Sequence, residues 1–212
     1  MFRNVYWHHA VRAATVLYKR VVGDALQHRL MTGEELVGAT DEGIMYLLES
    51  RAAHHAGDVP RTLAAGLAAL RARRLPKRAA ELAAADLPDG AAGEWLVADT
   101  SLKRRAEEAV AAELGLAAGA VFLDYPEKSL MFGLDLLVRR RSGEVLRLGP
   151  EGRAGLIGLP EIAAELYRTA RVLRLFTFGE RRDIEPALLA ALAARSAQEM
   201  EEELQAGRPL LA

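Results

Sequence analysis

The sequence predicts a mainly helical first part followed by a small α+β sandwich with a mostly antiparallel sheet. Apolar residues recur at the three-to-four spacing of amphipathic helices through most of residues 1–85. The stretch 86–93 holds one Pro, two Gly and two Asp, so we expect the chain to break there. Beyond it, short apolar runs alternate with helical ones. With 212 residues the chain is long enough for two parts, which we expect at 1–85 and 94–212.

The first part is expected to be helical throughout. The spacing of apolar residues predicts a helix over about 6–24. Thr32 with Glu35 three positions on resembles a capping box, so a second helix is expected to begin at Thr32. Asp41 and Pro60 indicate the starts of a third and a fourth helix.

The second part is predicted to contain both strands and helices. The expected helices are 102–114, 160–167 and a long final helix from 186 to about 205. The expected strands are 95–99, 121–125, 134–140, 144–148 and 172–178. Gly143 lies between 134–140 and 144–148, which predicts that these two strands form a hairpin.

Composition excludes several classes of protein. The chain has no Cys, so a thiolate nucleophile, a zinc finger and an iron–sulfur cluster are excluded. No apolar run approaches the ~20 residues of a membrane span, and the polar, aromatic start is unlike a signal peptide. We therefore expect a cytoplasmic protein with no membrane partner.

Residues 1–80 carry 12 Lys and Arg against 7 Asp and Glu, which favours an anionic ligand there but is also compatible with ordinary surface charge.

Sequence motifs for a self-sufficient catalytic site are missing. The chain has neither H-E-x-x-H, nor a His-Asp dipeptide, nor the G-x-S-x-G or phosphate-loop patterns. His54 and His55 are neighbours, so on a helix their side chains diverge, and we interpret them as a helix end. We expect no catalytic residue and no metal ligand in this chain.

The beginning of the first helix has an unusual composition. Arg3, Tyr6, Trp7, His8 and His9 place cationic and aromatic groups where free helix N–H groups already favour an anion. Such groups suit a sugar-phosphate, with the cations on phosphate and the rings on the sugar or base. The alternative is that the aromatic residues are core anchors and the basic groups are solvated.

The same segment carries a family resemblance. The first 22 residues resemble the helix that follows the catalytic core in HD-superfamily deoxynucleoside triphosphate triphosphohydrolases of the SAM-and-HD-domain type, whose motif reads roughly Arg-x-x-Tyr-x-His-Lys. Later segments resemble that family in the same order: 32–37 and 41–48, 71–78, 121–125, the hairpin, 159–166 and 172–178. The resemblance spans nearly the whole chain.

The resemblance implies a fold, an activity and roles for particular residues. The chain would be the C-terminal half of such an enzyme, and the divalent metal that activates the attack would belong to an HD segment upstream of it. Tyr6 and Trp7 would line the substrate sugar, whereas Arg3, His8 and His9 would bind the phosphates of an effector nucleotide such as GTP or a dNTP. His9 stands where the family has Lys, so phosphate binding is expected to weaken as pH rises from about 5.5 to 7.5.

Two other functions remain open at this point. The chain could be a stand-alone regulatory or interaction module without catalysis. Nucleic-acid binding through Arg71–Arg78 is the weaker alternative, because that stretch lacks aromatic residues and reads as a solvated helix end. We expect a homo-oligomer or a partner HD segment, because the apolar faces at Leu63–Leu70 and Leu188–Leu192 exceed what a small sandwich buries.

Overall fold

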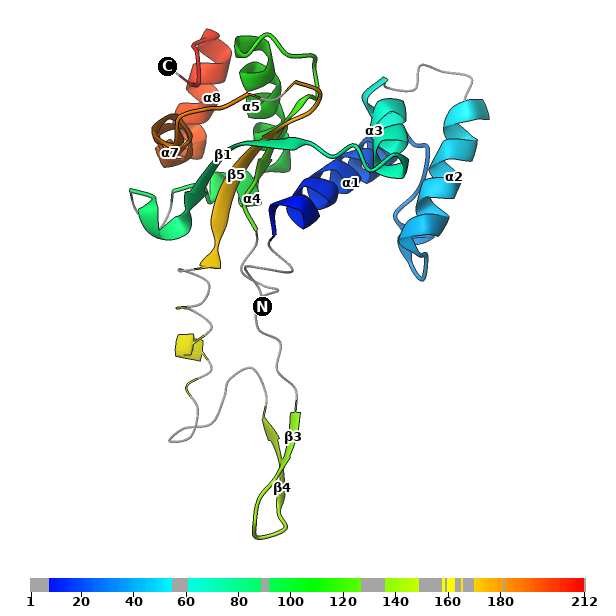
Figure 1. Ribbon diagram of the computed structural model, residues 1–212, viewed down its shortest axis with the longest axis vertical. Helices are drawn as coiled ribbons and strands as arrows, with labels where there is room; N and C mark the ends of the chain where they lie inside the picture. The colour runs from blue at the N-terminus through cyan, green and yellow to red at the C-terminus, as the bar shows by residue number, and fades with distance from the viewer. Residues whose placement is uncertain are drawn as a thin grey trace.

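The computed structural model places a helical unit beside an α+β lobe, and a β-hairpin projects away from both (Figure 1). It describes residues 8–54, 61–88, 92–126, 136–148, 158, 160–162, 165, 170–180 and 182–211. The expected order of a helical part followed by an α+β part is confirmed. No helix in these ranges combines the length and the apolar character needed to cross a membrane.

The helical unit is built from three α-helices and one short 3-10 helix. These elements are α1 (His9–Gln27), η2 (Glu34–Leu36), α2 (Asp41–His54) and α3 (Arg61–Arg71). Their apolar faces meet in a core of Val21, Ala25, Leu30, Met31, Ile44, Leu48, Leu63 and Leu67. Helices α1 and α3 pack closely at Gly66, where an added Cβ atom would lie 2.6 Å from Cγ2 of Val21.

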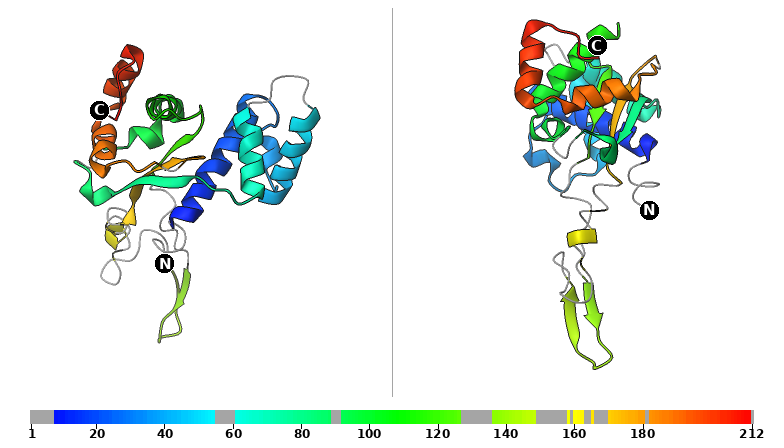
Figure 2. Two further views of the ribbon diagram at one scale, coloured as in Figure 1. Left: turned by 45° about the horizontal axis from the view of Figure 1, so that its top comes forward. Right: turned by 90° about the vertical axis from the view of Figure 1, so that its left-hand side faces the viewer.

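The lobe is a three-stranded antiparallel sheet with helices. Its elements are β1 (Lys77–Ala83), η3 (Ala84–Asp86), α4 (Trp95–Ala98), α5 (Thr100–Glu113), β2 (Val121–Asp124), β5 (Val172–Thr177), α7 (Pro186–Ala194) and α8 (Ala197–Ala206). The strand order is β1-β5-β2, so β5 is the central strand and all six of its residues are buried. Figure 2 shows the lobe and the helical unit from two further directions.

The two faces of the sheet belong to different cores, because side chains alternate along a strand. On β2 and β5, Leu123 and Leu175 pack in the core shared with α5, α7 and α8. Phe122 and Phe176 face the other way and pack against Ala13, Val16 and Leu17 of α1. Helix α1 therefore belongs to both units, and its contact with the sheet forms the seam between them.

The hairpin consists of β3 (Leu136–Arg139) and β4 (Val145–Leu148), paired antiparallel with Leu136 opposite Leu148. Its turn contains Gly143 at φ +91°, a conformation that favours glycine. The expectation of a hairpin with glycine in the turn is confirmed. Four apolar side chains of these strands are exposed, namely Leu136, Leu137, Val138 and Val145.

Two expectations about element type were wrong. Residues 77–83 are the edge strand β1, whereas residues 1–85 were expected to be helical throughout. This alanine-rich segment is a strand because it pairs along its length with β5, with a bulge between Arg78 and Ala80. The expected strand at 95–99 is instead the short helix α4.

Two expected helices also differ from those observed. Thr32 does donate its backbone N–H to the Glu35 carboxylate at 2.9 Å, but only the 3-10 helix η2 follows, and Gly38 at φ +74° comes soon after it. The final helix is interrupted at Arg195 and Ser196, and α8 begins there with a complete capping box. Of the helix expected at 160–167, residues 160–162 and 165 are helical and the rest lie outside the described residues.

The apolar faces expected to drive self-association are buried within the chain itself. Leu63 and Leu67 lie in the core of the helical unit, and Leu189 and Leu192 lie in the core of the lobe. Contrary to the expectation from the sequence, these faces are therefore not left uncovered, and self-association would need another surface. Among the described residues, four of the nine exposed large apolar side chains lie close together on the hairpin.

Candidate functional site

The beginning of α1 holds the part of the expected nucleotide site that the structure describes. His8 is the N-cap residue, and its ring Nδ1 accepts a long hydrogen bond of 3.4 Å from the backbone N–H of Ala10. The rings of His8 and His9 lie 4.2 Å apart between centroids, and both side chains are exposed. Arg3, Tyr6 and Trp7 lie outside the described residues.

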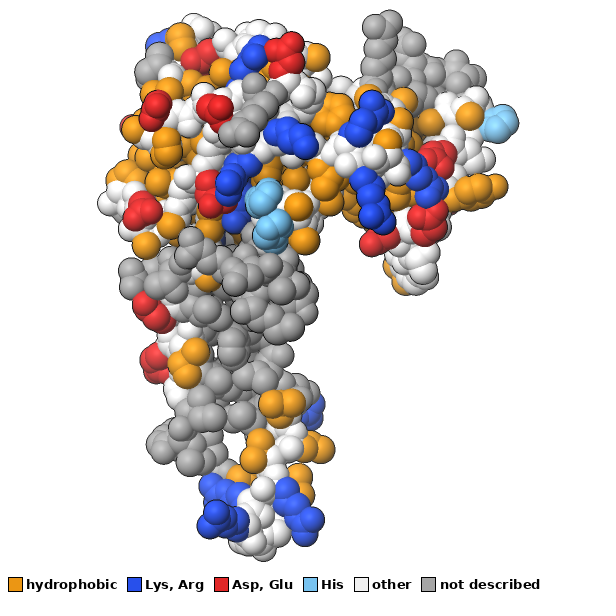
Figure 3. All heavy atoms as spheres, in the orientation of Figure 1, with side chains coloured by type: hydrophobic (Ala, Val, Ile, Leu, Met, Phe, Trp, Pro, Cys, Tyr) orange, Lys and Arg blue, Asp and Glu red, His pale blue; other side chains and the backbone are white. Residues whose placement is uncertain are grey.

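The charges of two arginines and one glutamate of the sheet, Arg78, Arg174 and Glu81, act on His9. With His8 and His9 these residues form what we call the helix-mouth cluster. Glu81 on β1 accepts from Arg78 at 2.9 Å and from Arg174 of β5 at 2.7 Å. Figure 3 shows the pale blue His side chains beside Lys or Arg and Asp or Glu side chains on this face. The cluster thus joins residues that are far apart in the sequence.

The electrostatic balance of the helix-mouth cluster favours an anion. Partial loss of water around the largely exposed ring lowers the pKa of the His9 imidazole, and the charges of His8, Arg78 and Arg174 lower it further against the opposing effect of Glu81. The Arg174 side chain is only 4% exposed, and its Nη1 atom is buried with no hydrogen-bond partner in the structure. A guanidinium nitrogen in that position is a donor without an acceptor, which is costly unless an acceptor binds.

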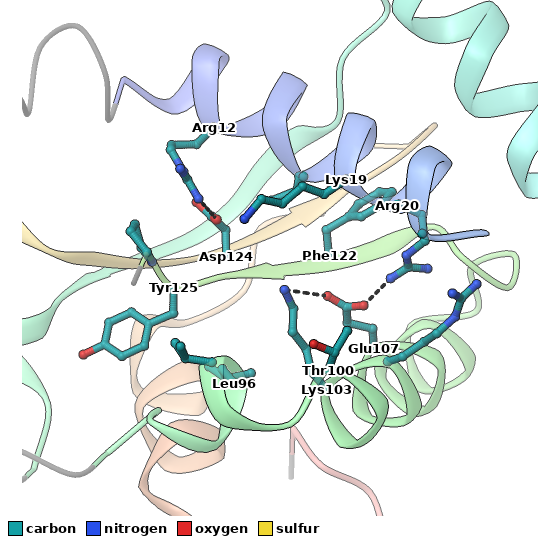
Figure 4. Close-up of a pocket in the computed structure, with 15 residues that line it drawn as sticks. Arg12, Lys19, Arg20, Leu96, Thr100, Lys103, Glu107, Phe122, Asp124 and Tyr125 are labelled. Atoms are coloured by element: carbon teal, nitrogen blue, oxygen red, sulfur yellow. Dashed lines mark hydrogen bonds and ion pairs between the residues drawn. The ribbon is translucent and has the colours of Figure 1, made fainter. Parts of the chain in front are cut away.

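A second feature is a cavity of about 270 Å³ at the seam, which we call the seam pocket (Figure 4). Helix α1 forms one wall, and α4, α5 and the end of β2 form the other. Its cationic side chains are Arg12, Lys19, Arg20, Lys103 and Arg104, and its acidic ones are Glu107 and Asp124. The α1 residues in this wall include Arg12, Val16, Lys19, Arg20 and Gly23, whose spacing places them on one side of the helix.

The arginines of the seam pocket are held by buried carboxylates. Arg12 binds Asp124 through two hydrogen bonds, of 2.8 Å from Nε and 2.5 Å from Nη2. Arg20 pairs with Glu107, which also accepts the backbone N–H of Leu123 at 2.7 Å. Burial raises the pKa of the Glu107 carboxyl, whereas Lys103 and Arg20 oppose that rise.

The lysines of the seam pocket are held much less firmly. Lys103 lies 3.9 Å from a carboxylate oxygen of Glu107, beyond hydrogen-bond distance. Lys19 makes no hydrogen bond or ion pair with any of the residues that the structure describes. Figure 4 shows these two side chains entering the pocket from opposite walls.

The remaining expectations about sites have mixed outcomes. Helix α2 ends at His54, whose ring Nδ1 lies 2.7 Å from the Ser50 carbonyl oxygen, as expected for a helix end. Arg71 at the end of α3 pairs with Glu49 and Glu42, so this part of the basic stretch is engaged within the protein. Within the described ranges, no group of three or more His, Asp or Glu side chains could hold a metal ion.

Sequence reasoning did not find the seam pocket. The side chains of α1 that line it are visible as a polar strip at 12, 19 and 20, but the partners of Arg12 and Arg20 lie 112 and 87 residues later, on β2 and α5. It also did not find Arg78, Glu81 and Arg174 as neighbours of His9, because residues 77–83 were expected to be helical.

Comparison with known proteins gives one match. A family model described as "HD associated region" matches residues 1–151, which include all of the helical unit, β1, α4, α5, β2 and the hairpin. Comparisons with curated proteins and with solved structures gave no match.

Proposed function

Because this chain belongs to the family of HD associated regions, we propose that it serves a metal-dependent nucleotide phosphohydrolase of the HD superfamily. Its part is to contact nucleotide and to provide an assembly surface. The specific type we propose is the deoxynucleoside triphosphate triphosphohydrolase that the sequence resembles, acting in the cytoplasm.

The divalent metal of such an enzyme activates the attack on the triphosphate when it is bound. The described residues of this chain do not fit that metal, since none of their His, Asp and Glu side chains gather in a group of three or more that could hold it. The part proposed for this chain is therefore binding, and the metal is proposed to belong to an HD segment.

The helix-mouth cluster carries the proposal. His8 and His9 stand at the positive end of the α1 dipole, and Arg78 and Arg174 lie beside His9. The single strongest observation is the buried Nη1 atom of Arg174, which lacks an acceptor. A phosphate oxygen is the acceptor that such a donor favours once the side chains that cover it move aside, and each charge-assisted hydrogen bond contributes about 1.5–3 kcal/mol. In the proposal, Arg3 joins the phosphate contacts and Tyr6 and Trp7 pack on the sugar.

The proposal includes a dependence on pH. Because the pKa of His9 is lowered from 6.5, its imidazole is mostly neutral at pH 7 in the free protein. A bound phosphate stabilises the protonated ring, so the affinity for nucleotide increases as pH falls. The lowered pKa places this change at lower pH than the ordinary His value would.

Calorimetric titration of dGTP into the full chain at pH 5.0 and 7.5 tests the proposal. We expect tighter binding at pH 5.0, and we expect a His8→Ala, His9→Ala double variant to lose most of that gain. Loss of one contact of about 1.5–3 kcal/mol corresponds to roughly a ten- to hundredfold weaker affinity. His28→Ala is the matched control, because His28 is an exposed histidine at the other end of α1. Equal affinities at both pH values, or equal losses in both variants, would contradict the proposal.

The assembly surface that we propose is the hairpin. Leu137 is 76% exposed, and its neighbours on β3 and β4 expose three further apolar side chains. Clusters of this kind mark sites of protein association. The same observation favours the second candidate function, an interaction module without catalysis.

Light scattering on the wild type and on the Leu137→Asp variant tests association through the hairpin. A wild-type particle larger than a monomer, which the substitution dissociates, supports association. A monomer of 23.0 kDa for both proteins contradicts it.

A further inference from the structure

The seam pocket holds cationic groups that its own acidic residues do not neutralise. Asp124 forms a close ion pair with Arg12, and Glu107 forms a close ion pair with Arg20. Arg104 has its own partner outside the pocket, Asp24, at 2.6 Å. Lys103 keeps only a long ion pair of 3.9 Å with Glu107, which it shares with Arg20, and Lys19 has no ion pair with any residue that the structure describes. The two lysines stand on opposite walls.

These two lysines face a space that both apolar and polar side chains line. Phe122 of β2 forms the floor between them, and Leu96 of α4 lines the same cavity. Lys19 is exposed and the Lys103 side chain is 26% exposed, so both ammonium groups are accessible to an anion that enters the pocket from solvent. Two cations that face one concave space attract an anion more strongly than either does alone. The hydroxyl group of Thr100 lines the pocket as a further hydrogen-bonding group.

The size and the charge of the pocket define the class of ligand. Its volume of about 270 Å³ lies just below the ~300–1,000 Å³ typical of sites for drug-sized ligands, so the occupant is small. A phosphate monoester carries about −1.5 to −2 charges near pH 7, which matches two lysines. We propose that the seam pocket binds a small molecule through a phosphate or pyrophosphate group held between Lys19 and Lys103.

This site is separate from the helix-mouth cluster, and the inference does not rest on the proposed function. Its residues lie along the face of α1 that packs on the lobe, whereas the charged neighbours of His9 belong to β1 and β5. Because α1 carries one lysine and α5 the other, a ligand that bridges them adds a contact across the seam. Bound ligand therefore stabilises the arrangement of the helical unit on the lobe.

The test uses pyrophosphate as the probe and the ¹⁵N-labelled full chain, at constant ionic strength adjusted with sodium chloride. We expect saturable shifts of amides in 16–23 and 100–107. A Lys19→Gln, Lys103→Gln double variant should bind at least tenfold more weakly. Lys77→Gln, which removes an exposed lysine of β1, and His8→Ala with His9→Ala should leave these shifts and their affinity unchanged. Shifts that do not saturate, or an affinity that the double variant does not change, would overturn the inference.

A second measurement needs no substitution. Lysines of the wild type are acetylated with a water-soluble reagent, and the rate at each lysine is followed by mass spectrometry of its peptides. Pyrophosphate is expected to slow acetylation of Lys19 and Lys103 severalfold and to leave Lys77 unchanged. Equal rates with and without pyrophosphate at Lys19 and Lys103, or equal protection of Lys77, would show that the pocket does not bind the probe.

Discussion

Arg12 and Asp124 hold α1 against the end of β2 through a two-point ion pair between residues 112 positions apart. The Asp124 side chain is 4% exposed and that of Arg12 is 15% exposed. Burial is the largest single effect on the pKa of the Arg12 guanidinium, and it lowers that pKa. The hydrogen bond to Asp124 and the charge of Asp124 together outweigh burial, so the pKa is raised. The pair therefore fixes the seam on which both candidate sites depend.

Removing one member of this pair should be strongly destabilising. Arg12→Ala leaves a buried carboxylate without its partner, which costs about 3 kcal/mol or more in free energy of unfolding. Urea denaturation of Arg12→Ala, Asp124→Asn and the double variant gives the coupling between the two residues. We expect the double variant to be less destabilised than the sum of the single variants. A loss below about 1 kcal/mol for Arg12→Ala, the range of exposed pairs, would show that the pair is not effectively buried.

Glu35 should make the stability of the helical unit dependent on pH in the acidic range. Hydrogen bonds from Arg51, and then from the backbone of Thr32, lower the pKa of this carboxyl from 4.5 to about 2. A lowered pKa means that the unfolded chain takes up the proton first, so the stabilisation is complete above about pH 4.5 and is lost as pH falls toward 2.

Thermal unfolding of the wild type and Glu35→Gln at several pH values measures this effect. The wild type should be the more stable protein at pH 6, and the difference should shrink as pH decreases from 4.5 to 2. A difference that stays constant over this range would contradict the assignment.

His9 should titrate below the ordinary histidine value of 6.5. Partial loss of water around the largely exposed ring is the main cause, followed by the charges of His8, Arg78 and Arg174. Because the folded state disfavours the protonated ring, this residue's contribution to stability is complete above pH 6.5 and is lost as pH falls below it. An NMR titration of the His9 ring gives the midpoint, and Arg78→Gln should raise it. A midpoint above 6.5 in the wild type would contradict the positive potential at the helix mouth.

The capping box of α8 should contribute about 1 kcal/mol to the free energy of unfolding. The Ser196 hydroxyl accepts the backbone N–H of Glu199, and the Glu199 carboxylate accepts the backbone N–H of Ser196 at 2.7 Å. Ser196→Ala should lower the Tm by about 2–4 °C, the shift typical of a chain of this length. Ser50→Ala, at an exposed position in the second half of α2, is the control and should not lower the Tm. Equal Tm values for Ser196→Ala and the wild type would mean that α8 does not need its cap.

Local signals were enough for much of the fold. Three elements were predicted because the signal for each lies within its own residues. These signals are the apolar spacing of α1, the Asp41 start of α2 and the apolar run of β5. The interruption between α7 and α8 was also present in the sequence, as Ser196 followed by Glu199, but the continuous alanine-rich pattern concealed it.

Long-range pairing decided what the sequence could not predict. Lys77–Ala83 has the alanine-rich composition of a helix, but it forms a strand because it pairs antiparallel with β5 along its length. Glu81 therefore reaches Arg174, and His9 acquires its cationic neighbours. The seam pocket likewise depends on the packing of α1 against α5 and β2, which no local pattern encodes.

The most direct test of the proposed function is an amide shift map of the ¹⁵N-labelled chain titrated with dGTP at pH 6. The proposal predicts saturable shifts at His8–Arg12, at Arg78–Glu81 and at Arg174, with a downfield change in the Arg174 side-chain signal as Nη1 gains an acceptor. Shifts scattered over the surface, or confined to residues outside the helix-mouth cluster, would contradict a nucleotide site at the beginning of α1.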